Sequence, residues 1–413
     1  MKVLVIGGGA REHALCRALS LDTDVSELHC APGNAGIAQI AQTHQVDPLD
    51  GTAVADLAVA LGAGFVIVGP EAPLVAGVSD AVRGRGIPVF GPSGEAARLE
   101  GSKAFAKDVM AAAGVPTARS YLCTTPAEAA EALDAFGAPY VVKDDGLAAG
   151  KGVVVTADLQ AALDHAASCD RVVIEEFLDG PEVSLFAVTD GVTVVPLQPA
   201  QDFKRAYDGD EGPNTGGMGA YSPLPWADPK LVDEVLETVL QPTVDELRRR
   251  GTPFSGLLYA GLAITSRGVR VIEFNARFGD PETQVVLARL KTPLNGFLYA
   301  AATGRLADFP DLRWRDGAAV TVVVAAEGYP ESPRSGDPIT GLAEAEAEDG
   351  TAYVLHAGTR ADADGTILSA GGRVLSVTAT GRDIPQARAR AYAAVSHLGL
   401  KGSHHRGDIA AKL

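Results

Sequence analysis

Residues 141–155 read VVKDDGLAAGKGVVV, in which two runs of strand-forming residues flank a loop of glycine, alanine and charged residues. A Walker phosphate-binding loop needs four residues between its first glycine and its Gly-Lys pair, then a hydroxyl residue and a helix. Here only three residues separate Gly146 from Gly150, and Gly152 follows Lys151. The next segment, VVVT, predicts a strand. The stretch therefore predicts a glycine-rich β-hairpin, which by itself could equally be an idle mobile hairpin or a cover for phosphate.

The composition is that of a globular protein with several domains. The chain has 413 residues, of which 46% are hydrophobic and 6% aromatic. Its longest apolar runs, such as AAVTVVVAA at 318–326, are too short to span a bilayer. The four cysteines lack the spacing of a zinc site or a disulfide framework, so we expect a reducing, cytoplasmic setting. The net charge of −17 argues against nucleic acid and anionic membrane as partners, because both require a basic surface.

The first hundred residues alternate strand-like and helix-like segments. Apolar runs such as KVLVI and FVIVGP alternate with helical patterns near 11–20, 52–61 and 74–83, which predicts a parallel, doubly wound α/β sheet. The turns GGGAREH, APGNAG and GPEAPL follow strands, at the edge where such sheets bind ligands. GGGARE departs from the dinucleotide fingerprint, because Glu12 stands where its last glycine belongs. These turns favour a small molecule that bears a phosphate.

Three further units are expected after this N-terminal domain of residues 1–100. Residues 101–190 combine Ala-rich helices with the glycine hairpin, and residues 191–312 form a larger α+β region. Residues 313–413 predict a last domain of mixed α/β type, with strands such as RVLSVTAT and the helix IPQARARAYAAVSHLG. The predicted fold class is therefore α/β together with α+β.

Three other stretches contain groups suited to chemistry. In VRVIEFNARFGDPETQ, Glu273 and Asn275 leave the same face of a strand and offer two oxygens suited to Mg²⁺, and Arg277 follows them. In RVVIEEFLDGPEVS, Glu175 and Glu182 bracket a turn. QDFKRAYDGDEGPNTGGMGAYSP, at 201–223, predicts a long loop with many free backbone N–H groups, which is typical of an active-site lid. The first two stretches, taken singly, are explained equally well by solvated turns.

The ordered set of motifs resembles the ATP-grasp ligases. VVKDDGLAAGKG, VIEEFLDGPEVS, GPNTGGMGAYSP and VIEFNARFGDPETQ follow VIVGPEAPLVAG and LEGSKAF in this order. They are most similar to the members that join glycine to 5-phosphoribosylamine in purine biosynthesis, and the resemblance extends to HAGT, GGRVL and HRGDIA near the C-terminus. It implies a Rossmann-like N-terminal domain, two ATP-grasp lobes and a small mixed C-terminal domain. It also implies an ATP-dependent carbon–nitrogen ligase that works through glycyl phosphate as a monomer, with Mg²⁺ or Mn²⁺.

The resemblance also assigns roles to residues of this sequence. It implies catalytic roles for Arg277, Asp280 and Lys143, and Mg²⁺ or Mn²⁺ ligands in Glu273 and Asn275. The residues that would bind ATP are Lys103, Lys143, Gly150, Lys151, Gly152, Glu175, Glu176, Phe177, Leu178 and Glu182. The residues that would bind glycine and 5-phosphoribosylamine are Gly9, Arg11, Glu12, Asn34, Gly36, Pro70, Glu71, Asp202, Lys204, Arg205, Asn214, Thr215, Gly216, Gly217, Arg277, Asp280, Pro281 and Glu282.

Three positions depart from the pattern of the family. Asp144 stands where alanine is usual after the hairpin lysine, and Phe203 replaces the histidine of QDHKR. The strand SGLLYAGLAI lacks the additional metal-binding acid of related enzymes, which leaves the number of bound metals open. The alternatives are another ATP-grasp ligase or carboxylase, such as one that activates bicarbonate, a regulatory protein that binds nucleotide without catalysis, and, more distantly, a dehydrogenase.

Overall fold

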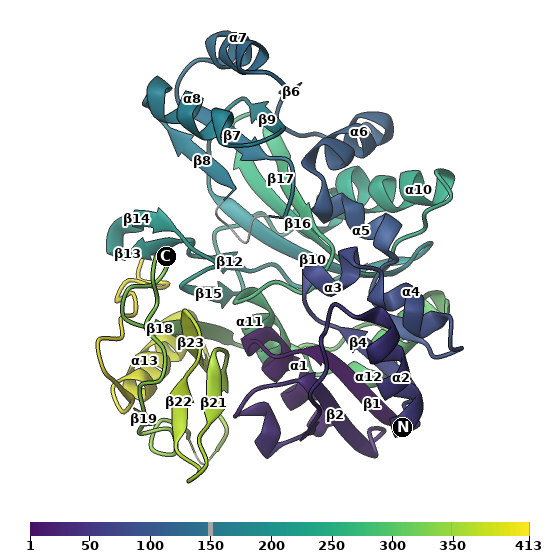
Figure 1. Cartoon of the computed structure of the whole chain (residues 1–413), viewed down its shortest axis with the longest axis vertical. Coiled ribbons are helices and arrows are strands. Elements are labelled where there is room, and N and C mark those ends of the chain that lie inside the picture. The colour runs from purple at the N-terminus through teal and green to yellow at the C-terminus, as the bar shows by residue number, and fades with distance from the viewer. Residues whose placement is uncertain (148–151, 348, 413) are drawn as a thin grey trace.

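The computed structural model describes residues 1–147, 152–347 and 349–412. Within these residues the strands form four larger sheets and three two-stranded ribbons (Figure 1). One large hydrophobic cluster includes residues of the N-terminal, central and C-terminal sheets, such as Leu4, Leu185 and Val322. The sheet at the top of Figure 1 has a small separate core that includes Leu133 and Ile174. This upper sheet is therefore packed as a unit of its own.

The N-terminal sheet is parallel and doubly wound, as predicted. Its strand order is β3-β2-β1-β4-β5, and β1 pairs in parallel with both β2 and β4. The expected helix near 74–83 is two helices, because Gly77 adopts φ +83° between them. The strands are β1 (Lys2–Gly7), β2 (Glu27–Pro32), β3 (Gln42–Thr43), β4 (Phe65–Val68) and β5 (Val89–Phe90). The helical segments are α1 (Ala10–Ser20), η1 (Ile37–Gln39), α2 (Gly51–Leu61), α3 (Glu71–Val75), α4 (Val78–Arg83), α5 (Gly94–Gly101) and α6 (Lys103–Ala113).

The upper sheet contains the glycine hairpin. Its order is β6-β9-β7-β8 and all its pairs are antiparallel. The pairing of Val142 with Val154 confirms the hairpin predicted from VVKDDGLAAGKGVVV. The strands are β6 (Ser120–Cys123), β7 (Tyr140–Asp144), β8 (Val153–Thr156) and β9 (Val172–Glu175), with helices α7 (Pro126–Phe136) and α8 (Leu159–Ala167).

The central sheet lies between the upper sheet and the N-terminal sheet (Figure 1). Its order is β11-β10-β16-β17, all antiparallel. The strands are β10 (Glu182–Asp190), β11 (Val194–Pro196), β16 (Ser255–Thr265) and β17 (Gly268–Asn275). The helical segments are α9 (Leu231–Val235), η3 (Leu236–Leu240), α10 (Gln241–Arg249), α11 (Glu282–Arg289), α12 (Leu294–Ala302) and η4 (Leu306–Asp308).

The C-terminal sheet includes two strands from the middle of the chain. Its order is β12-β15-β18-β23-β20, and β15 pairs with β18. The predicted long loop at 201–223 is therefore wrong in part: its backbone groups pair in short strands, which satisfies N–H and C=O groups that a loop would leave to water. The division of the chain at residues 100, 190 and 312 stays a prediction. The strands are β12 (Gln201–Asp202), β15 (Gly219–Ser222), β18 (Ala318–Ala325), β20 (Ala352–His356) and β23 (Arg373–Gly381), covered by helix α13 (Ile384–Val395).

Three ribbons complete the structure. The ribbon β13–β14 carries part of the 201–223 segment, and the other two lie in the C-terminal part of the chain. They are β13 (Arg205–Tyr207) with β14 (Glu211–Asn214), joined through η2 (Asp208–Asp210); β19 (Ile339–Thr340) with β24 (Gly399–Leu400); and β21 (Thr359–Ala361) with β22 (Ile367–Ser369). In the described part of the chain, every helix is too short or too polar to cross a membrane.

Candidate active site

A buried carboxylate joins two lysines where the upper sheet meets the central sheet. Glu175, at the end of β9, lies 2.8 Å from Lys107 Nζ through one oxygen and 2.8 Å from Lys143 Nζ through the other. Lys143 also donates to the carbonyl oxygen of Ile272 in β17 (2.9 Å). Burial raises the pKa of Glu175, but the two ammonium groups outweigh it and hold the pKa below its usual value. Two cationic side chains are thus fixed at this junction.

The linker after β9 was expected to contact adenine. Glu176 is paired with Arg119 (3.0 Å) and with Arg267 (3.2 Å), so its carboxylate is engaged on the protein. Phe177 is 48% exposed and Leu178 is half-buried, so both offer apolar surface. Their contact with adenine stays a prediction.

The glycine hairpin is anchored at the start of α6. Lys103 donates to the carbonyl oxygen of Gly146 (3.0 Å). Asp145 accepts hydrogen bonds from Ser102 Oγ (3.1 Å) and from the backbone N–H of Ala104 (3.0 Å), as a capping residue does. The first part of the hairpin loop is therefore held against the helix that carries Lys103.

The base of the hairpin is closed by a backbone hydrogen bond. The backbone N–H of Asp144 donates to the carbonyl oxygen of Gly152 (2.7 Å), which closes the base of the hairpin, and the Asp144 side chain is half-buried. Gly150 and Lys151, both predicted to bind ATP, lie outside the described residues.

Strand β17 carries the predicted metal ligands. Glu273 and Asn275 are two residues apart on this strand, so both side chains leave one face. Glu273 pairs with Gly261 of β16, where an added Cβ would lie 3.4 Å from Glu273 Cγ. No cluster of three or more Asp, Glu, His or Cys residues able to hold a metal occurs in the described ranges. The two oxygens still fit Mg²⁺, which often takes one or two protein ligands and shares the rest with phosphate and water.

Arg277 follows β17 and joins it to the N-terminal sheet. Its half-buried guanidinium lies 3.1 Å from Glu71 Oε2 and 3.1 Å from Glu100 Oε1. Its Nη2 is 3.5 Å from Asn275 Oδ1. Burial lowers the pKa of Arg277, but the nearby carboxylates of Glu100 and Glu71 more than reverse this, so the group stays charged.

The turn GGGAREH begins α1 and meets the same network. Arg11 is buried, donates to the carbonyl oxygen of Phe278 (3.0 Å) and lies 3.9 Å from Glu71 Oε2. Glu12 pairs with Arg11 (2.5 Å) and accepts from the backbone N–H of Gly9 (2.7 Å). The glycines of the turn leave room for this carboxylate, since a Cβ added at Gly7 would lie 2.6 Å from Glu12 Cδ. Pro70 is the N-cap residue of α3 and directly precedes its first residue, Glu71.

The APGNAG turn connects the N-terminal sheet to the C-terminal sheet. Asn34 donates to the carbonyl oxygen of His356 in β20 (2.8 Å), and its own Oδ1 accepts from the backbone N–H of Gly36 (3.0 Å). The backbone N–H of His356 donates to His13 Nδ1 in α1 (2.8 Å). Burial lowers the pKa of His13 to about 3 and that of His356 to about 4.

A second group of charged side chains lies beside the central sheet. Lys204 is 2.5 Å from Glu182 and 3.5 Å from Asp202, and these carboxylates raise its pKa in spite of burial. Tyr259 donates its hydroxyl to Glu282 Oε1 (2.6 Å), whereas Glu282 Oε2 is buried without a hydrogen-bond partner. Burial and the nearby Asp202 raise the pKa of Glu282 to about 7. This carboxyl can gain or lose a proton near neutral pH.

The predicted substrate loop folds back on these groups. Arg205 pairs with Asn214 in the ribbon β13–β14. Thr215 donates to the carbonyl oxygen of Lys204 through both its backbone N–H (2.7 Å) and its hydroxyl (2.8 Å). Gly217 has φ +114°, and an added Cβ would lie 2.4 Å from Pro281 Cδ. The loop is thus in close contact with the segment that follows Arg277.

Asp280 stands at the centre of this contact. One oxygen accepts from Gln284 Nε2 (2.8 Å), and the other lies 3.5 Å from Arg373 Nη2. A Cβ added at Gly9 would be 3.7 Å from the same Asp280 oxygen. Burial raises the pKa of Asp280, but the charges of Arg373 and Arg11 lower it by more. The pKa is therefore below its usual value and the carboxylate stays charged. Asp280 therefore connects the N-terminal turn, the central sheet and the C-terminal sheet.

The surroundings of Phe203 explain how a phenylalanine is accommodated where the family usually has histidine. Its ring lies 5.0 Å from the Arg406 guanidinium and 6.2 Å from the Tyr221 ring. Arg406 is 1% exposed and donates to the carbonyl oxygen of Arg205 (3.2 Å). The aromatic ring therefore packs under a buried cation that supports the substrate ribbon.

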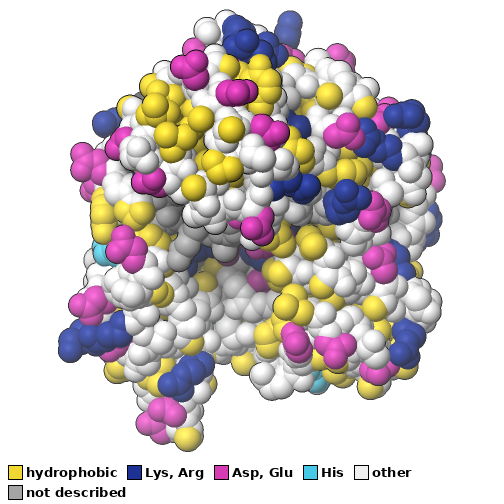
Figure 2. All heavy atoms as spheres, turned by 45° about the horizontal axis from the view of Figure 1, so that its top comes forward, with side chains coloured by type: hydrophobic (Ala, Val, Ile, Leu, Met, Phe, Trp, Pro, Cys, Tyr) yellow, Lys and Arg dark blue, Asp and Glu magenta, His cyan; other side chains and the backbone are white. Residues whose placement is uncertain are grey.

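Sequence reasoning assigned no role to several residues of this site. Lys107 contacts Glu175, Glu100 contacts Arg277, and Arg373 contacts Asp280. A signal was available for two of them, since Glu100 lies in LEGSKAF and Arg373 in GGRVL, two of the stretches that carry the resemblance. The face of the molecule that Figure 2 shows has a hollow near its centre.

Comparisons with known proteins agree with this geometry. The N, ATP-grasp (A) and C domain models of phosphoribosylglycinamide synthetase match residues 1–100, 101–283 and 319–412. The chain belongs to the phosphoribosylglycinamide synthetase family. Among its relatives in this family, the phosphoribosylamine–glycine ligase of Streptomyces coelicolor is 80% identical over 100% of this chain and 99% of its own. That of Leifsonia xyli is 59% identical over the full length of both chains.

Solved structures support the same assignment. The crystal structure of phosphoribosylamine–glycine ligase from Thermotoga maritima has a TM-score of 0.85 at 33% identity, and covers 99% of this chain and 100% of its own. A biotin carboxylase from Campylobacter jejuni has a TM-score of 0.75 at 16% identity, with 98% and 93% covered, and is similar in fold alone. The expected ATP-grasp architecture of this chain is therefore confirmed.

Proposed function

We propose that this chain ligates glycine to 5-phosphoribosylamine with ATP, giving glycinamide ribonucleotide, ADP and phosphate. One observation carries the proposal: residues 272–277, at the end of β17 and directly after it, contact both the predicted ATP site and the predicted 5-phosphoribosylamine site. Ile272 accepts from Lys143, Glu273 and Asn275 share a face, and Arg277 binds Glu71 at the start of α3 in the N-terminal part of the chain. A nucleotide at the lysines and a phosphosugar at the N-terminal turns would therefore meet along one strand.

ATP would lie between the upper and central sheets. Lys103 and Lys143 would contact its phosphates, and the linker 175–178 would contact its base. Glu273 and Asn275 would hold Mg²⁺ or Mn²⁺, which when bound neutralises charge on the phosphates. Their oxygens suit such hard cations.

The first step would be phosphoryl transfer to the carboxylate of glycine. An unactivated carboxylate does not condense with an amine in water, so its oxygen attacks the γ-phosphorus in line and ADP leaves. Arg277 stays charged because of Glu71 and Glu100, and would stabilise the transferring phosphoryl group. The protein's contribution at this step is position and charge.

The second step would form the amide. The amine of 5-phosphoribosylamine attacks the carbonyl carbon of glycyl phosphate, the bond to phosphate breaks, and the amine nitrogen loses a proton. Asp280 and the loop 214–217 would line this meeting point, with Asp202, Lys204 and Glu282 beside it. The phosphate of the sugar would lie at the turns that begin α1 and α3, where backbone N–H groups favour anions.

The second candidate is an ATP-grasp enzyme that activates bicarbonate, favoured only by the likeness in fold to biotin carboxylases. The test is ADP release by the purified chain with ATP and Mg²⁺, with either glycine plus 5-phosphoribosylamine or bicarbonate as the acceptor. We expect ADP and glycinamide ribonucleotide in the first mixture alone. ADP release that requires bicarbonate would refute the proposal. A monomeric, cytoplasmic enzyme whose domains divide at residues 100, 190 and 312 remains part of the proposal.

A further inference from the structure

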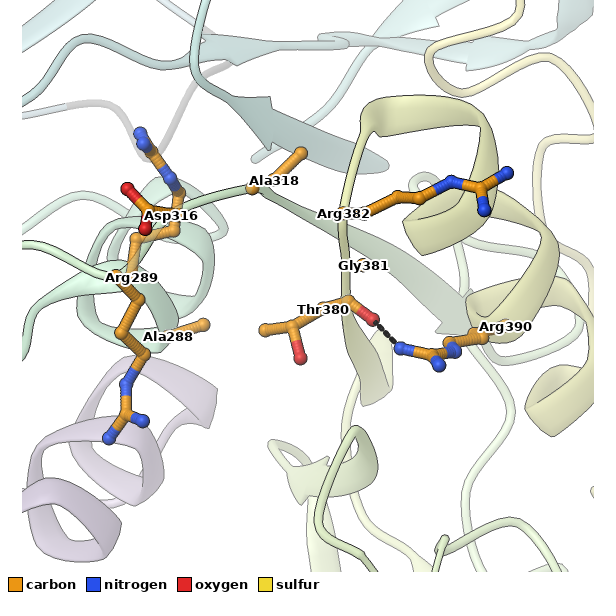
Figure 3. A pocket seen from close by; sticks show the side chains of 10 residues that line it. Ala288, Arg289, Asp316, Ala318, Thr380, Gly381, Arg382 and Arg390 are labelled. Atoms are coloured by element: carbon orange, nitrogen blue, oxygen red, sulfur yellow. Dashed lines mark hydrogen bonds between the residues drawn. The ribbon is translucent and has the colours of Figure 1, made fainter.

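The arginines of the C-terminal part of the chain differ in what they contact. A cavity of about 330 Å³ beside the C-terminal sheet is lined by Arg289, Arg382 and Arg390, among others (Figure 3). Their guanidinium groups point in different directions, and Arg390 donates to the carbonyl oxygen of Thr380 (2.7 Å). Because these charges do not converge, the cavity has no arrangement for an anion. Arg373, in contrast, turns its guanidinium toward the candidate active site.

Arg373 binds two distant segments of the chain at once, residues 216–217 and Asp280. Its Nη1 donates to the carbonyl oxygens of Gly216 (2.7 Å), Gly217 (3.3 Å) and Asp280 (2.8 Å). Its Nη2 lies 3.5 Å from the Asp280 carboxylate. Arg373 is the first residue of β23 in the C-terminal sheet. Its side chain contacts Asp280, 93 residues earlier, and Gly216, 157 residues earlier.

The surroundings suit a planar guanidinium. A Cβ added at Gly216 would lie 2.9 Å from Arg373 Cζ, so the glycine backbone packs directly on the plane of the group. The arginine side chain is about one-fifth exposed, at 21%. The three carbonyls are all contacted by Nη1, while Nη2 lies beside the Asp280 carboxylate. A lysine has a single nitrogen, so it could not serve the carbonyls and the carboxylate from two separate donor atoms.

We propose that Arg373 is a positioning residue for the ligation step. It fixes the loop 214–217 and Asp280 relative to each other, and these are the groups placed above at the meeting point of glycine and amine; the inference thus rests on the proposed function. Arg373 acts through these groups. The two lysines that are proposed to contact ATP bind elsewhere, Lys103 to Gly146 and Lys143 to Ile272. The loss of Arg373 should therefore affect glycine and 5-phosphoribosylamine and spare ATP.

The test compares Arg373→Ala and Arg373→Lys with the wild type and with Arg390→Ala. Arg390 is a matched control, because it is an arginine of the same C-terminal unit that also donates to a backbone carbonyl, away from the site. For Arg373→Ala we expect kcat/KM for glycine to fall about 100-fold, the magnitude typical of a misplacement near 1 Å. The Kd for ATP should stay within about twofold, and Arg373→Lys should lie between the two.

Chemical rescue separates positioning from a purely structural role. Guanidinium ion at low millimolar concentration should restore part of the glycine activity of Arg373→Ala and leave Arg390→Ala unchanged. The inference is overturned if Arg373→Ala matches the wild type. It is also overturned if affinity for ATP, thermal stability and turnover fall together without rescue. If the wild type forms no glycinamide ribonucleotide, the proposed function itself fails, which the same assay reports before any variant is compared.

Discussion

The histidines at the junction of the N-terminal and C-terminal sheets should make the stability of this interface depend on pH. His13 and His356 are 7% and 4% exposed, and the backbone N–H of His356 donates to His13 Nδ1 (2.8 Å). Arg17 on the same helix is a further cation that disfavours charge on His13. Burial, the first cause, keeps the pKa of His13 at about 3 and that of His356 at about 4.

The sign follows from proton binding in the two states. The unfolded chain takes up protons on each histidine below a pKa of about 6.5, whereas the folded chain does not until far lower pH. The stability due to the neutral histidines is thus present above pH 6.5 and is lost as the pH falls. At pH 5, about 1.5 units below the unfolded pKa, each histidine should cost about 2 kcal/mol of unfolding free energy. The pair should cost about 4 kcal/mol.

A difference measurement is needed, because Glu282 acts in the opposite direction. Burial raises its folded pKa to about 7, so protonation of Glu282 adds stability as the pH falls. We therefore compare the wild type with the double variant His13→Asn, His356→Asn, in which the new amide oxygen at position 13 can replace His13 Nδ1 as the acceptor. Urea unfolding at pH 7 and pH 5 should show the wild type losing about 4 kcal/mol more than the double variant over this interval.

The control is His397→Gln, which removes an exposed histidine of the same C-terminal unit and should lose stability in parallel with the wild type. If the wild type and the double variant lose the same free energy between pH 7 and pH 5, the histidines are not held neutral and the reasoning fails.

The other predictions concern the proposed reaction and use the same ADP-release assay. Lys143→Ala should lower the rate of glycine-dependent ADP formation at least about 100-fold while the fold is kept, because it removes one of the two cations at Glu175. A turnover rate near that of the wild type would exclude Lys143 from the reaction. Glu273→Gln should raise the Mg²⁺ concentration needed for half-maximal rate about tenfold or more, and an unchanged Mg²⁺ dependence would remove Glu273 from the metal site. Gly217→Ala should lower kcat/KM for glycine, because Gly217 has φ +114° and an added Cβ would lie 2.4 Å from Pro281 Cδ. Gly209→Ala, in η2 of the ribbon that precedes Gly217 in the chain and with open space at the added Cβ, tests how far positive φ alone matters.

Much of this molecule is predictable from its sequence because local rules decide it. The doubly wound N-terminal sheet follows from alternating apolar runs, and the hairpin at β7–β8 follows from two β-branched runs around glycines. Glu273 and Asn275 share a face because strand periodicity is two. In each case the sequence pattern that predicts the element is local, although the strands themselves pair over longer separations, as Val3 does with Phe65.

The rest depends on partners that are distant in sequence. The segment 201–223 reads as a loop because its glycines and polar residues suppress any strand pattern, yet β15 pairs with β18 about a hundred residues later. Lys143 was predicted to contact phosphate, which stays a prediction; its pairing with Glu175 was not predicted, because it depends on the register of β7 with β9. No spacing rule reveals Arg373, whose contacts are to backbone carbonyls that every residue possesses.

The C-terminal unit is better understood as part of the active site than as an appendage. It supplies Arg373 to the loop 214–217 and Arg406 to the ribbon that begins at Arg205, and His356 closes on the N-terminal turn through Asn34. Each of these contacts supplies a hydrogen-bond donor to a backbone carbonyl, and such a hydrogen bond contributes about 0.5–1.5 kcal/mol. The upper sheet is tied to the rest of the chain by polar contacts, such as that of Lys143 with Ile272 and that of Glu175 with Lys107, but its hydrophobic core is separate. The construction thus holds the proposed meeting point of glycine and amine rigid from three sides, while it leaves the sheet that carries the glycine hairpin as the part best able to move over a nucleotide.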